Sequence, residues 1–151
     1  MMAGRLFEDW TVGDRVVHEI RRTVTETDNL LFTTMTHNPQ PLHLDVEAAK
    51  ASEFGQLLVV GTFTFSLMVG LSVGDTTLGT LIANLGYDKL VMPRPVFIGD
   101  TMRAETEVVG LRESGSRPTA GIVTFRHELF NQRGDIACQC LRTALVHRRS
   151  P

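Results

Sequence analysis

The segment from Leu57 to Val73 constrains the fold most strongly, because a helix built from it would be apolar on nearly every face. Such a helix must be covered by other parts of the chain. The segment contains Gly61 and Gly70 and is marginal in length for a membrane span, so we interpret it as a buried core helix that ends at Gly74-Asp75. Its large side chains form two faces, with Val60, Phe63, Leu67 and Leu71 on one and Phe65, Met68 and Val69 on the other.

After Thr80 the apolar residues change from helical spacing to a two-residue period, which predicts β-strands. Pro93-Arg94-Pro95 interrupts this pattern, and a turn is expected over residues 131–135. Because the strands follow one another with short links, we expect an antiparallel meander. One earlier strand is expected over residues 15–24, and the later strands over residues 80–92, 101–111, 121–130 and 136–147.

A long antiparallel sheet that must cover one apolar helix will curl around it. We therefore predict an α+β fold in which an antiparallel sheet wraps around a central helix. The 151 residues are the size of one domain, and we expect residues 1–151 to form a single unit. The formal net charge of -2 excludes a strongly basic surface for nucleic acid, and we expect no association with membranes.

Two shorter helices are expected before the core helix. Thr25 and Asp28 match a capping box, which predicts a helix that ends before Pro39. Asp45 is a good N-cap for a second helix over residues 46–52, with Gly55 at its C-terminal end. Capping explains Asp28 and Asp45, so we favour structural roles for both. The apolar side of the first helix carries Leu30, Leu31, Phe32 and Met35.

A stiff polar loop from Thr36 to Asp45 lies between these two helices. Pro39 and Pro41 fix the φ angle of the backbone and push the residues before them toward extended geometry, so we expect no helix in this loop. A loop that presents polar side chains in a fixed array is a good place for a functional site. Its polar side chains include His37, Asn38, Gln40 and His43.

Several motifs between Phe7 and Val146 resemble those of the MaoC-like (R)-specific enoyl-CoA hydratases. They are Leu42-His43-Leu44-Asp45, Ala48-Ala49-Lys50, Phe54-Gly55, Val60-Gly61 and Pro95-Val96-Phe97-Ile98-Gly99-Asp100-Thr101. The resemblance implies the hotdog fold, in which a sheet wraps around a central helix. It also implies reversible addition of water to an enoyl-CoA thioester. Such a hydro-lyase needs no cofactor beyond the coenzyme A of its substrate.

The similarity is greater still to one subgroup of that family, the mesaconyl-CoA and itaconyl-CoA hydratases and the methylmalyl-CoA dehydratases. This subgroup implies a branched, dicarboxylic C5 enoyl-CoA as substrate. The motifs that resemble it are Thr36-His37-Asn38-Pro39-Gln40-Pro41-Leu42-His43, Gly74-Asp75-Thr76-Thr77-Leu78-Gly79 and Ser116-Arg117-Pro118.

The resemblance assigns roles to individual residues. His43 matches the family's catalytic histidine, and Gly61 matches the glycine whose amide polarises the thioester carbonyl. The family carries an Asp five residues before the histidine and an Asn three before it, but Asn38 and Gln40 occupy these positions here. The departure matters because the family's Asp is half of its acid/base pair.

Hydration of a conjugated thioester requires a base, a donor to the enolate oxygen and a proton for the α carbon. His43 is the best base, because imidazole titrates near neutral pH, and the alternative is a structural histidine that bonds to loop carbonyls. Gly61 would offer a backbone amide at the positive end of the core helix, unless a glycine there merely permits close packing.

The other polar residues of the loop leave alternatives open. Asn38 has no useful basicity, so it either holds water or substrate or forms an Asx turn before Pro39. His37 is either a second titrating group or an exposed loop histidine. Gln40 either orients water or substrate or caps a backbone group.

A carboxylate on the substrate would require an arginine, which can hold it through two parallel hydrogen bonds. Arg94 and Arg117 are the candidates for this substrate contact. Each could instead be a surface residue or contact the phosphates of coenzyme A.

The remaining histidines carry no catalytic assignment. His127 alternates with apolar residues on a strand, which favours a core or interface position, and His18 and His147 give no signal. No acidic third ligand accompanies His37 and His43 at a recognisable spacing, so we expect no metal.

Cys138 and Cys140 lie two residues apart on a predicted strand and would face the same side. We interpret them as buried, reduced structural thiols, which agrees with a cytoplasmic protein. A lone hotdog domain has an exposed sheet edge that would be a liability if left unpaired. We therefore expect a homodimer or larger homo-oligomer.

Two other functions compete with hydration. A hotdog thioesterase would share the fold and the thioester substrate but typically uses a carboxylate as base, which the loop lacks. Alternatively, the chain would be a pseudo-hydratase that binds acyl-CoA or a partner chain without catalysis, with Asn38 as the disabling change.

Overall fold

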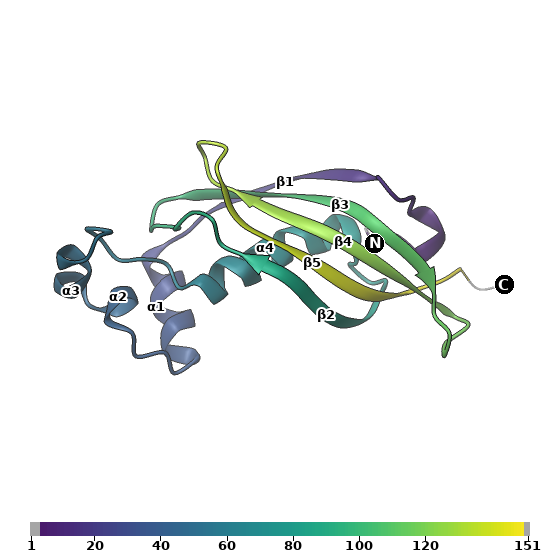
Figure 1. Cartoon of the computed structure of the whole chain (residues 1–151), viewed down its shortest axis with the longest axis horizontal. Coiled ribbons are helices and arrows are strands. Elements are labelled where there is room, and N and C mark those ends of the chain that lie inside the picture. Colours follow the sequence, from purple (N-terminus) through teal and green to yellow (C-terminus); the bar gives the residue numbers. More distant parts are fainter. Residues whose placement is uncertain (1–3, 150–151) are drawn as a thin grey trace.

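The computed structural model describes residues 4–149. A turn of 3-10 helix and a first strand precede four helices, and four further strands follow (Figure 1). The elements are the 3-10 turn Phe7–Asp9, β1 Arg15–Thr23, α1 Glu26–Met35, α2 Pro41–Leu44, α3 Val46–Ala51, α4 Gly61–Thr76, β2 Leu81–Val91, β3 Thr101–Glu113, β4 Ala120–Phe130 and β5 Ile136–His147. This order confirms the predicted α+β class. Between residues 4 and 149, no helix is long and apolar enough to cross a membrane.

The strands form one antiparallel sheet in the order β1-β3-β4-β5-β2. The predicted meander holds for β3, β4 and β5 but is wrong for β2, which pairs with β5 instead of β3. The connections explain this difference. Only residues 77–80 separate α4 from β2, so β2 starts beside the C-terminal end of the helix. The longer link over residues 92–100 then passes the other end of α4 to reach β3 (Figure 1).

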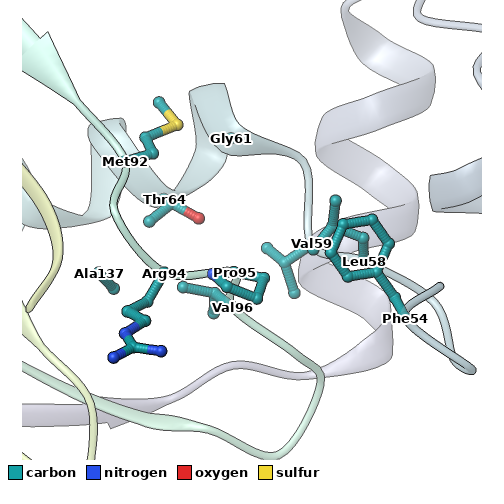
Figure 2. Close-up of a pocket in the computed structure, with 10 residues that line it drawn as sticks. All are labelled: Phe54, Leu58, Val59, Gly61, Thr64, Met92, Arg94, Pro95, Val96 and Ala137. Atoms are coloured by element: carbon teal, nitrogen blue, oxygen red, sulfur yellow. The ribbon is translucent and has the colours of Figure 1, made fainter. Parts of the chain in front are cut away.

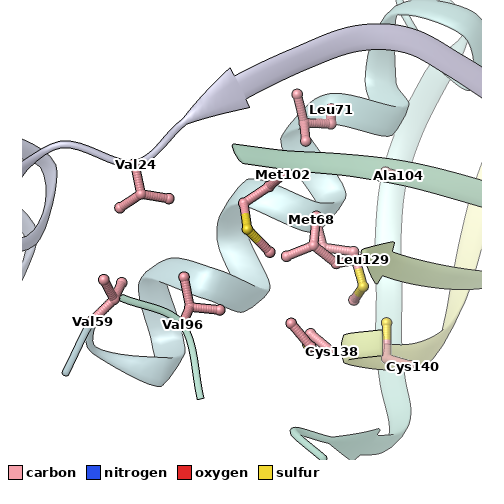
Figure 3. Packing of buried hydrophobic residues seen from close by; sticks show 11 residues of the cluster. Val24, Val59, Met68, Leu71, Val96, Met102, Ala104, Leu129, Cys138 and Cys140 are labelled. Carbon is pink, nitrogen blue, oxygen red and sulfur yellow. The ribbon is translucent and has the colours of Figure 1, made fainter. Parts of the chain in front are cut away.

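The sheet curls around α4, which is the hotdog arrangement implied by the resemblance (Figure 1). Met68 of α4 is fully buried in a core cluster with side chains from the strands (Figure 3). Cys138 and Cys140 of β5 belong to this cluster, and burial raises the pKa of their thiols to about 12 and about 11. The prediction of buried, reduced structural cysteines is therefore confirmed.

Within this chain α4 buries one side against the sheet, while a row of small residues on the opposite side is exposed. Of the two predicted apolar faces, Met68 and Leu71 are buried and Phe63, Phe65, Leu67 and Val69 are half-buried, so both faces are at least partly covered. The buried residues of α4 are Thr64, Met68, Leu71, Ser72 and Thr76, and the exposed row consists of Thr62, Ser66 and Gly70.

Long-range pairing makes α4 begin at Gly61, later than predicted. The residues before it are extended, because Leu58 forms a β-bridge with Phe97. The amide of Val59 also donates to the carbonyl of Val96 at 2.9 Å. These contacts replace the helical hydrogen bonds that the apolar sequence would otherwise allow.

Other predicted boundaries are wrong by small amounts. α4 runs past Gly74 to Thr76. The loop expected to be free of helix contains α2, Pro41–Leu44, because proline is compatible with the first position of a helix. α3 ends at Ala51, and Gly55, with φ +67, lies in the turn that follows rather than at the helix end.

The predicted N-caps are confirmed. In α1 the Asp28 amide donates to the Thr25 hydroxyl at 3.2 Å, and the Thr25 amide donates to the Asp28 carboxylate at 2.8 Å. In α3 the Asp45 carboxylate accepts from the amides of Glu47 and Ala48 at 2.9 and 3.1 Å. These bonds account for both carboxylates structurally.

α1 turns a polar side inward. Asn29 and Thr33 are its buried residues, whereas the side chains of Leu30, Leu31 and Met35 are 51%, 53% and 76% exposed. The first helix therefore docks through the hydrogen-bonding groups of Asn29 and Thr33 and through Phe32, whose ring packs edge-on against that of Phe63 with the ring centroids 5.6 Å apart, and its remaining apolar side chains are exposed.

A chain of buried polar groups lies between the sheet and the C-terminal half of α4. His127 is fully buried, as its alternation with apolar residues predicted, and burial lowers its pKa to about 3. Its Nδ1 lies 2.8 Å from the Thr106 hydroxyl, which lies 2.8 Å from Nε2 of His18. Nδ1 of His18 contacts the Asp75 carboxylate at 2.7 Å. Nothing in the sequence pointed to this role for His18.

Candidate active site

His43 lies on α2 with its imidazole half-buried. Its Nδ1 is 2.7 Å from the carbonyl oxygen of Leu58, a group that can only accept. In the neutral ring the proton therefore belongs on Nδ1, and Nε2 carries the free lone pair. The tautomer and ring direction are fixed in the way a general base requires.

Gly61 is the first residue of the 16-residue helix α4. Within residues 4–149 the backbone amides of Gly61 and Thr62 make no hydrogen bond, whereas those of Phe63 and Thr64 bond to the carbonyl of Val60. The free amides lie at the positive end of the helix dipole and can bind a developing negative charge on oxygen. A Cβ on Gly61 would approach Sδ of Met92 to 2.6 Å, so close packing also favours glycine here.

A cavity of about 250 Å³ opens beside the first turn of α4 (Figure 2). Its walls are mostly apolar, with the hydroxyl of Thr64 and the guanidinium of Arg94 as the polar side-chain groups. The lining residues are Phe54, Leu58, Val59, Gly61, Thr64, Met92, Arg94, Pro95, Val96 and Ala137.

Leu58 connects the two predicted catalytic residues. Its side chain lines the cavity together with Gly61, and its carbonyl holds the ring of His43. His43 itself lines a neighbouring cavity of about 50 Å³, next to Asn29 and Glu26. The structure thus places His43 and Gly61 on adjacent segments at the same end of α4.

His37 is exposed and stands at the C-terminal end of α1 with φ 55. Its amide donates to the Thr34 carbonyl, and the next amide, of Asn38, donates to the Thr33 carbonyl. This is a Schellman motif, whose left-handed position usually belongs to glycine. The backbone of His37 ends the helix, and its ring is not brought to the cavity.

Asn38 forms the Asx turn that was one of its two alternatives. Its Oδ1 accepts from the amide of Gln40 at 3.1 Å. Gln40 is exposed and is the N-cap of α2, although its side chain makes no capping bond. Its carbonyl instead accepts from the amide of His43 at 3.1 Å, which links this turn to the position of the catalytic candidate.

The two candidate arginines lie far apart. Arg94 borders the cavity, where its guanidinium extends away from Thr64 (Figure 2). It forms no ion pair within the part of the chain that the structure describes. Arg117 lies in the turn between β3 and β4, at the end of the sheet opposite α1, α2 and α3 (Figure 1). The structure does not bring Arg117 to the cavity of its own chain.

Three residues near the site were not identified by sequence analysis. Thr64 adds a hydroxyl to the cavity, Glu26 places a carboxylate beside the smaller cavity with His43, and Asn29 hydrogen-bonds to the backbone of both site segments. The signal that could have singled out Asn29 is Thr33, four residues later, because this spacing places two polar side chains on the same face of the helix.

Comparisons with known proteins find relatives along nearly the whole chain. A mesaconyl-CoA hydratase of Cereibacter sphaeroides is 35% identical over 97% of this chain and 42% of its own length. A beta-methylmalyl-CoA dehydratase of Chloroflexus aurantiacus is 30% identical over 98% of this chain and 42% of its own. The chain therefore spans about two fifths of the length of these two relatives.

A solved structure matches in both sequence and length. The MaoC-like dehydratase from Rhodospirillum rubrum superimposes with a TM-score of 0.84 at 34% identity and covers 98% of this chain and 100% of its own. The model of the MaoC like domain matches residues 8–129, which include the cap of α1, His43, Gly61 and every residue that lines the cavity except Ala137. The chain therefore belongs to the family of MaoC-like domains.

Proposed function

We propose that this chain is an enoyl-CoA hydratase and dehydratase, which adds water reversibly to the double bond of the thioester. The observation that carries the proposal is the ring of His43, held through Nδ1 by the Leu58 carbonyl so that Nε2 is free to accept a proton. The free amides at the start of α4 supply the second requirement. The similarity to a mesaconyl-CoA hydratase and to a beta-methylmalyl-CoA dehydratase supports the same reaction.

The proposed reaction uses these groups in sequence. Nε2 of His43 takes a proton from water while the water oxygen bonds to the β carbon. The electron pair of the double bond moves toward the thioester carbonyl, whose oxygen becomes an enolate oxygen bound by the amides of Gly61 and Thr62. The imidazolium of His43 then returns the proton to the α carbon. Dehydration follows the same steps in reverse.

Asn38 replaces the carboxylate that the family resemblance implies at its position. We assign to it the shape of the loop, through its bond to the Gln40 amide, and the ordering of water through its amide nitrogen. The role of His37 as a second titrating group and the role of Gln40 in orienting water or substrate stay predictions.

The substrate proposed for the cavity is a short, branched enoyl-CoA with a second carboxylate, such as mesaconyl-CoA or itaconyl-CoA. The apolar walls suit a short acyl group, and Arg94, which makes no ion pair with any residue of the described part of the chain, lies at the edge of the cavity. Arg94→Gln is then expected to lower kcat/KM for mesaconyl-CoA by about tenfold or more, the scale of one lost charge-assisted bond, and to spare crotonyl-CoA. Equal losses on both substrates would contradict this assignment.

We also propose that two copies pair through β2. This strand is an edge of the sheet, and large apolar side chains are exposed along it and just beyond. They are Leu85, Tyr87, Leu90, Val91 and Met92. Light scattering should give the mass of a dimer or a higher homo-oligomer, and a monomer at assay concentrations would contradict the pairing.

A thioesterase is the second candidate, because Glu26 places a carboxylate beside His43. One assay separates the functions. Purified protein is incubated with crotonyl-, mesaconyl- and itaconyl-CoA, while enoyl absorbance and free thiol are followed together. Loss of absorbance without thiol supports hydration. Thiol release that Glu26→Gln abolishes supports the thioesterase, and binding without either signal supports a non-catalytic acyl-CoA binder.

A further inference from the structure

Asn29 is a buried amide whose side chain makes hydrogen bonds to two other segments, α2 and residues 58–60, and to Thr33 of its own helix. Only 1% of its surface is exposed. Its Nδ2 donates to the carbonyl of His43 at 3.0 Å and to the carbonyl of Leu58 at 3.5 Å. Its Oδ1 accepts from the amide of Val60 at 2.9 Å and from the hydroxyl of Thr33 at 3.4 Å. Both donors and both lone pairs of the side chain are therefore used.

The direction of this amide is fixed by the chemistry of its partners. Carbonyl oxygens can only accept, so His43 and Leu58 require the nitrogen of the side chain. The backbone amide of Val60 can only donate, so it requires the oxygen. A side chain with only donors or only acceptors could not satisfy this arrangement, and an apolar one would leave buried polar groups without partners.

The two ends of the amide hold the two halves of the candidate active site. On the nitrogen side, the Leu58 carbonyl also accepts from Nδ1 of His43 at 2.7 Å, so Asn29 fixes the group that sets the imidazole tautomer. On the oxygen side, Val60 is the N-cap of α4, directly before the free amide of Gly61. A single planar group thus spans the supports of the base and of the carbonyl-binding amide.

We propose that Asn29 is a positioning residue that sets the distance between Nε2 of His43 and the amide of Gly61. This inference rests on the proposed hydration and extends it to a residue that touches neither water nor thioester. Misplacement of a catalytic group by about 1 Å can cost a factor of about 10² in rate, so the expected effect is on kcat rather than on KM.

The first test compares three variants. Asn29→Ala removes both the donor and the acceptor of the side chain. Asn29→Asp keeps the size and the acceptor for Val60 but places an oxygen against the carbonyls of His43 and Leu58. Thr33→Val is the matched control, because it removes a hydrogen bond to the same side chain from an equally buried neighbour that, within residues 4–149, makes no hydrogen bond to His43 or Val60. We expect kcat to fall about 10²-fold in both Asn29 variants, with KM nearly unchanged, and to stay at the wild-type value in Thr33→Val.

Rates are corrected for the folded fraction measured by circular dichroism, so that loss of stability alone does not imitate the effect. If Asn29→Ala fails to fold, the isosteric Asn29→Asp carries the comparison. A kcat of Asn29→Asp equal to that of Thr33→Val would overturn the proposal.

The second test measures the tautomer of the His43 ring directly, by nitrogen NMR of protein in which the histidines carry a nitrogen label. The signal of His43 is assigned by its loss in His43→Gln. The wild type should show the Nδ1-protonated tautomer, and Asn29→Asp should show a mixture of tautomers. This result would stand even if the wild type proved inactive on every enoyl-CoA, so failure of the function and failure of the positioning role are distinguishable. An unchanged tautomer in Asn29→Asp would overturn the positioning role whatever the activity.

Discussion

The two ends of α4 use their backbone groups in opposite ways. At the C-terminal end the Val73 carbonyl accepts from the amides of Thr77 and Leu78 at 3.0 and 2.9 Å, and the Thr76 carbonyl accepts from the Arg5 amide at 3.0 Å. At the N-terminal end, within the described chain, the amides of Gly61 and Thr62 have no partner.

The side chains around the two ends differ in burial. Near the C-terminal end Arg142, His18 and His127 are buried, and Arg142 donates to the hydroxyl of Thr77 at 3.2 Å. Nε2 of His127 has no hydrogen-bond partner within residues 4–149, so it is buried rather than bonded. Near the N-terminal end His43 is half-buried, with one nitrogen held and the other free.

The difference shows that burial, not residue type, separates structural from catalytic candidates among the histidines of this chain. His127 and His43 are both imidazoles, but burial lowers the pKa of His127 to about 3, so it stays neutral at any working pH. One end of α4 therefore stabilises the fold, and the other end is available for chemistry.

The largest effect is expected at the N-terminal end, from His43→Ala. Without the base, kcat should fall by about 10²–10⁴-fold, while the unfolding temperature stays close to that of the wild type. His147→Ala, which removes an exposed histidine at the end of β5, serves as the control. Both variants are measured by steady-state kinetics with the enoyl-CoA that the wild type turns over fastest. Near-full activity in His43→Ala would contradict a catalytic role for the N-terminal end of α4.

Gly61→Pro sharpens the comparison by deleting one backbone amide. Proline suits the first position of a helix, and Val60 already has the extended conformation, φ -60 and ψ 128, that a residue before proline prefers. The fold should persist while kcat falls about 10²–10³-fold, the usual cost of one missing oxyanion donor. Gly61→Ala, which keeps the amide, should retain more activity than Gly61→Pro, and equal rates in the two variants would contradict a role for the amide.

At the opposite end, Thr106→Val should affect stability without affecting turnover. The hydroxyl of Thr106 contacts both His18 and His127 at 2.8 Å, so its loss leaves buried polar atoms without partners. We expect a loss of about 1–3 kcal/mol in the free energy of unfolding, measured with urea, at unchanged kcat per folded molecule. A specific fall in kcat would show that the two ends are coupled.

The smallest effect concerns pH. The pKa of His127 is about 3 in the folded state against an ordinary value of 6.5, so below pH 6.5 the unfolded chain binds a proton that the folded chain does not. Stability therefore falls as the pH is lowered from 6.5, by up to about 1.4 kcal/mol per pH unit from this group. Urea unfolding between pH 7 and pH 5 should show a shallower dependence in His127→Gln, and identical slopes would contradict the burial effect.

The sequence predicts well those features that depend on neighbouring residues, such as helix caps, or on a regular spacing of apolar residues, such as strands. The caps at Thr25 and Asp45 and the strands after Thr80 are of this kind. The start of α4 was missed because its preceding residues pair with Val96 and Phe97, more than thirty residues away. The place of β2 in the sheet depends likewise on connections that a periodic pattern does not encode.

In the candidate site, too, local features could be predicted and long-range contacts could not. His43 and Gly61 could be proposed from their motifs, and the Asx turn of Asn38 follows from its immediate neighbours. The role of Asn29 could not be predicted, because its partners His43 and Val60 lie 14 and 31 residues away and meet only in the folded chain. The separation of Arg94 from Arg117 is equally a property of the fold.

The most direct test of hydration at His43 is to follow the oxygen of water. The protein is incubated with mesaconyl-CoA in water labelled with ¹⁸O, and the products are analysed by mass spectrometry, with His43→Ala in parallel. We predict label in the β-hydroxyl of an intact acyl-CoA, formed by the wild type and lost in the variant. Label in the carboxylate of a free acid, or equal labelling by His43→Ala, would contradict the account.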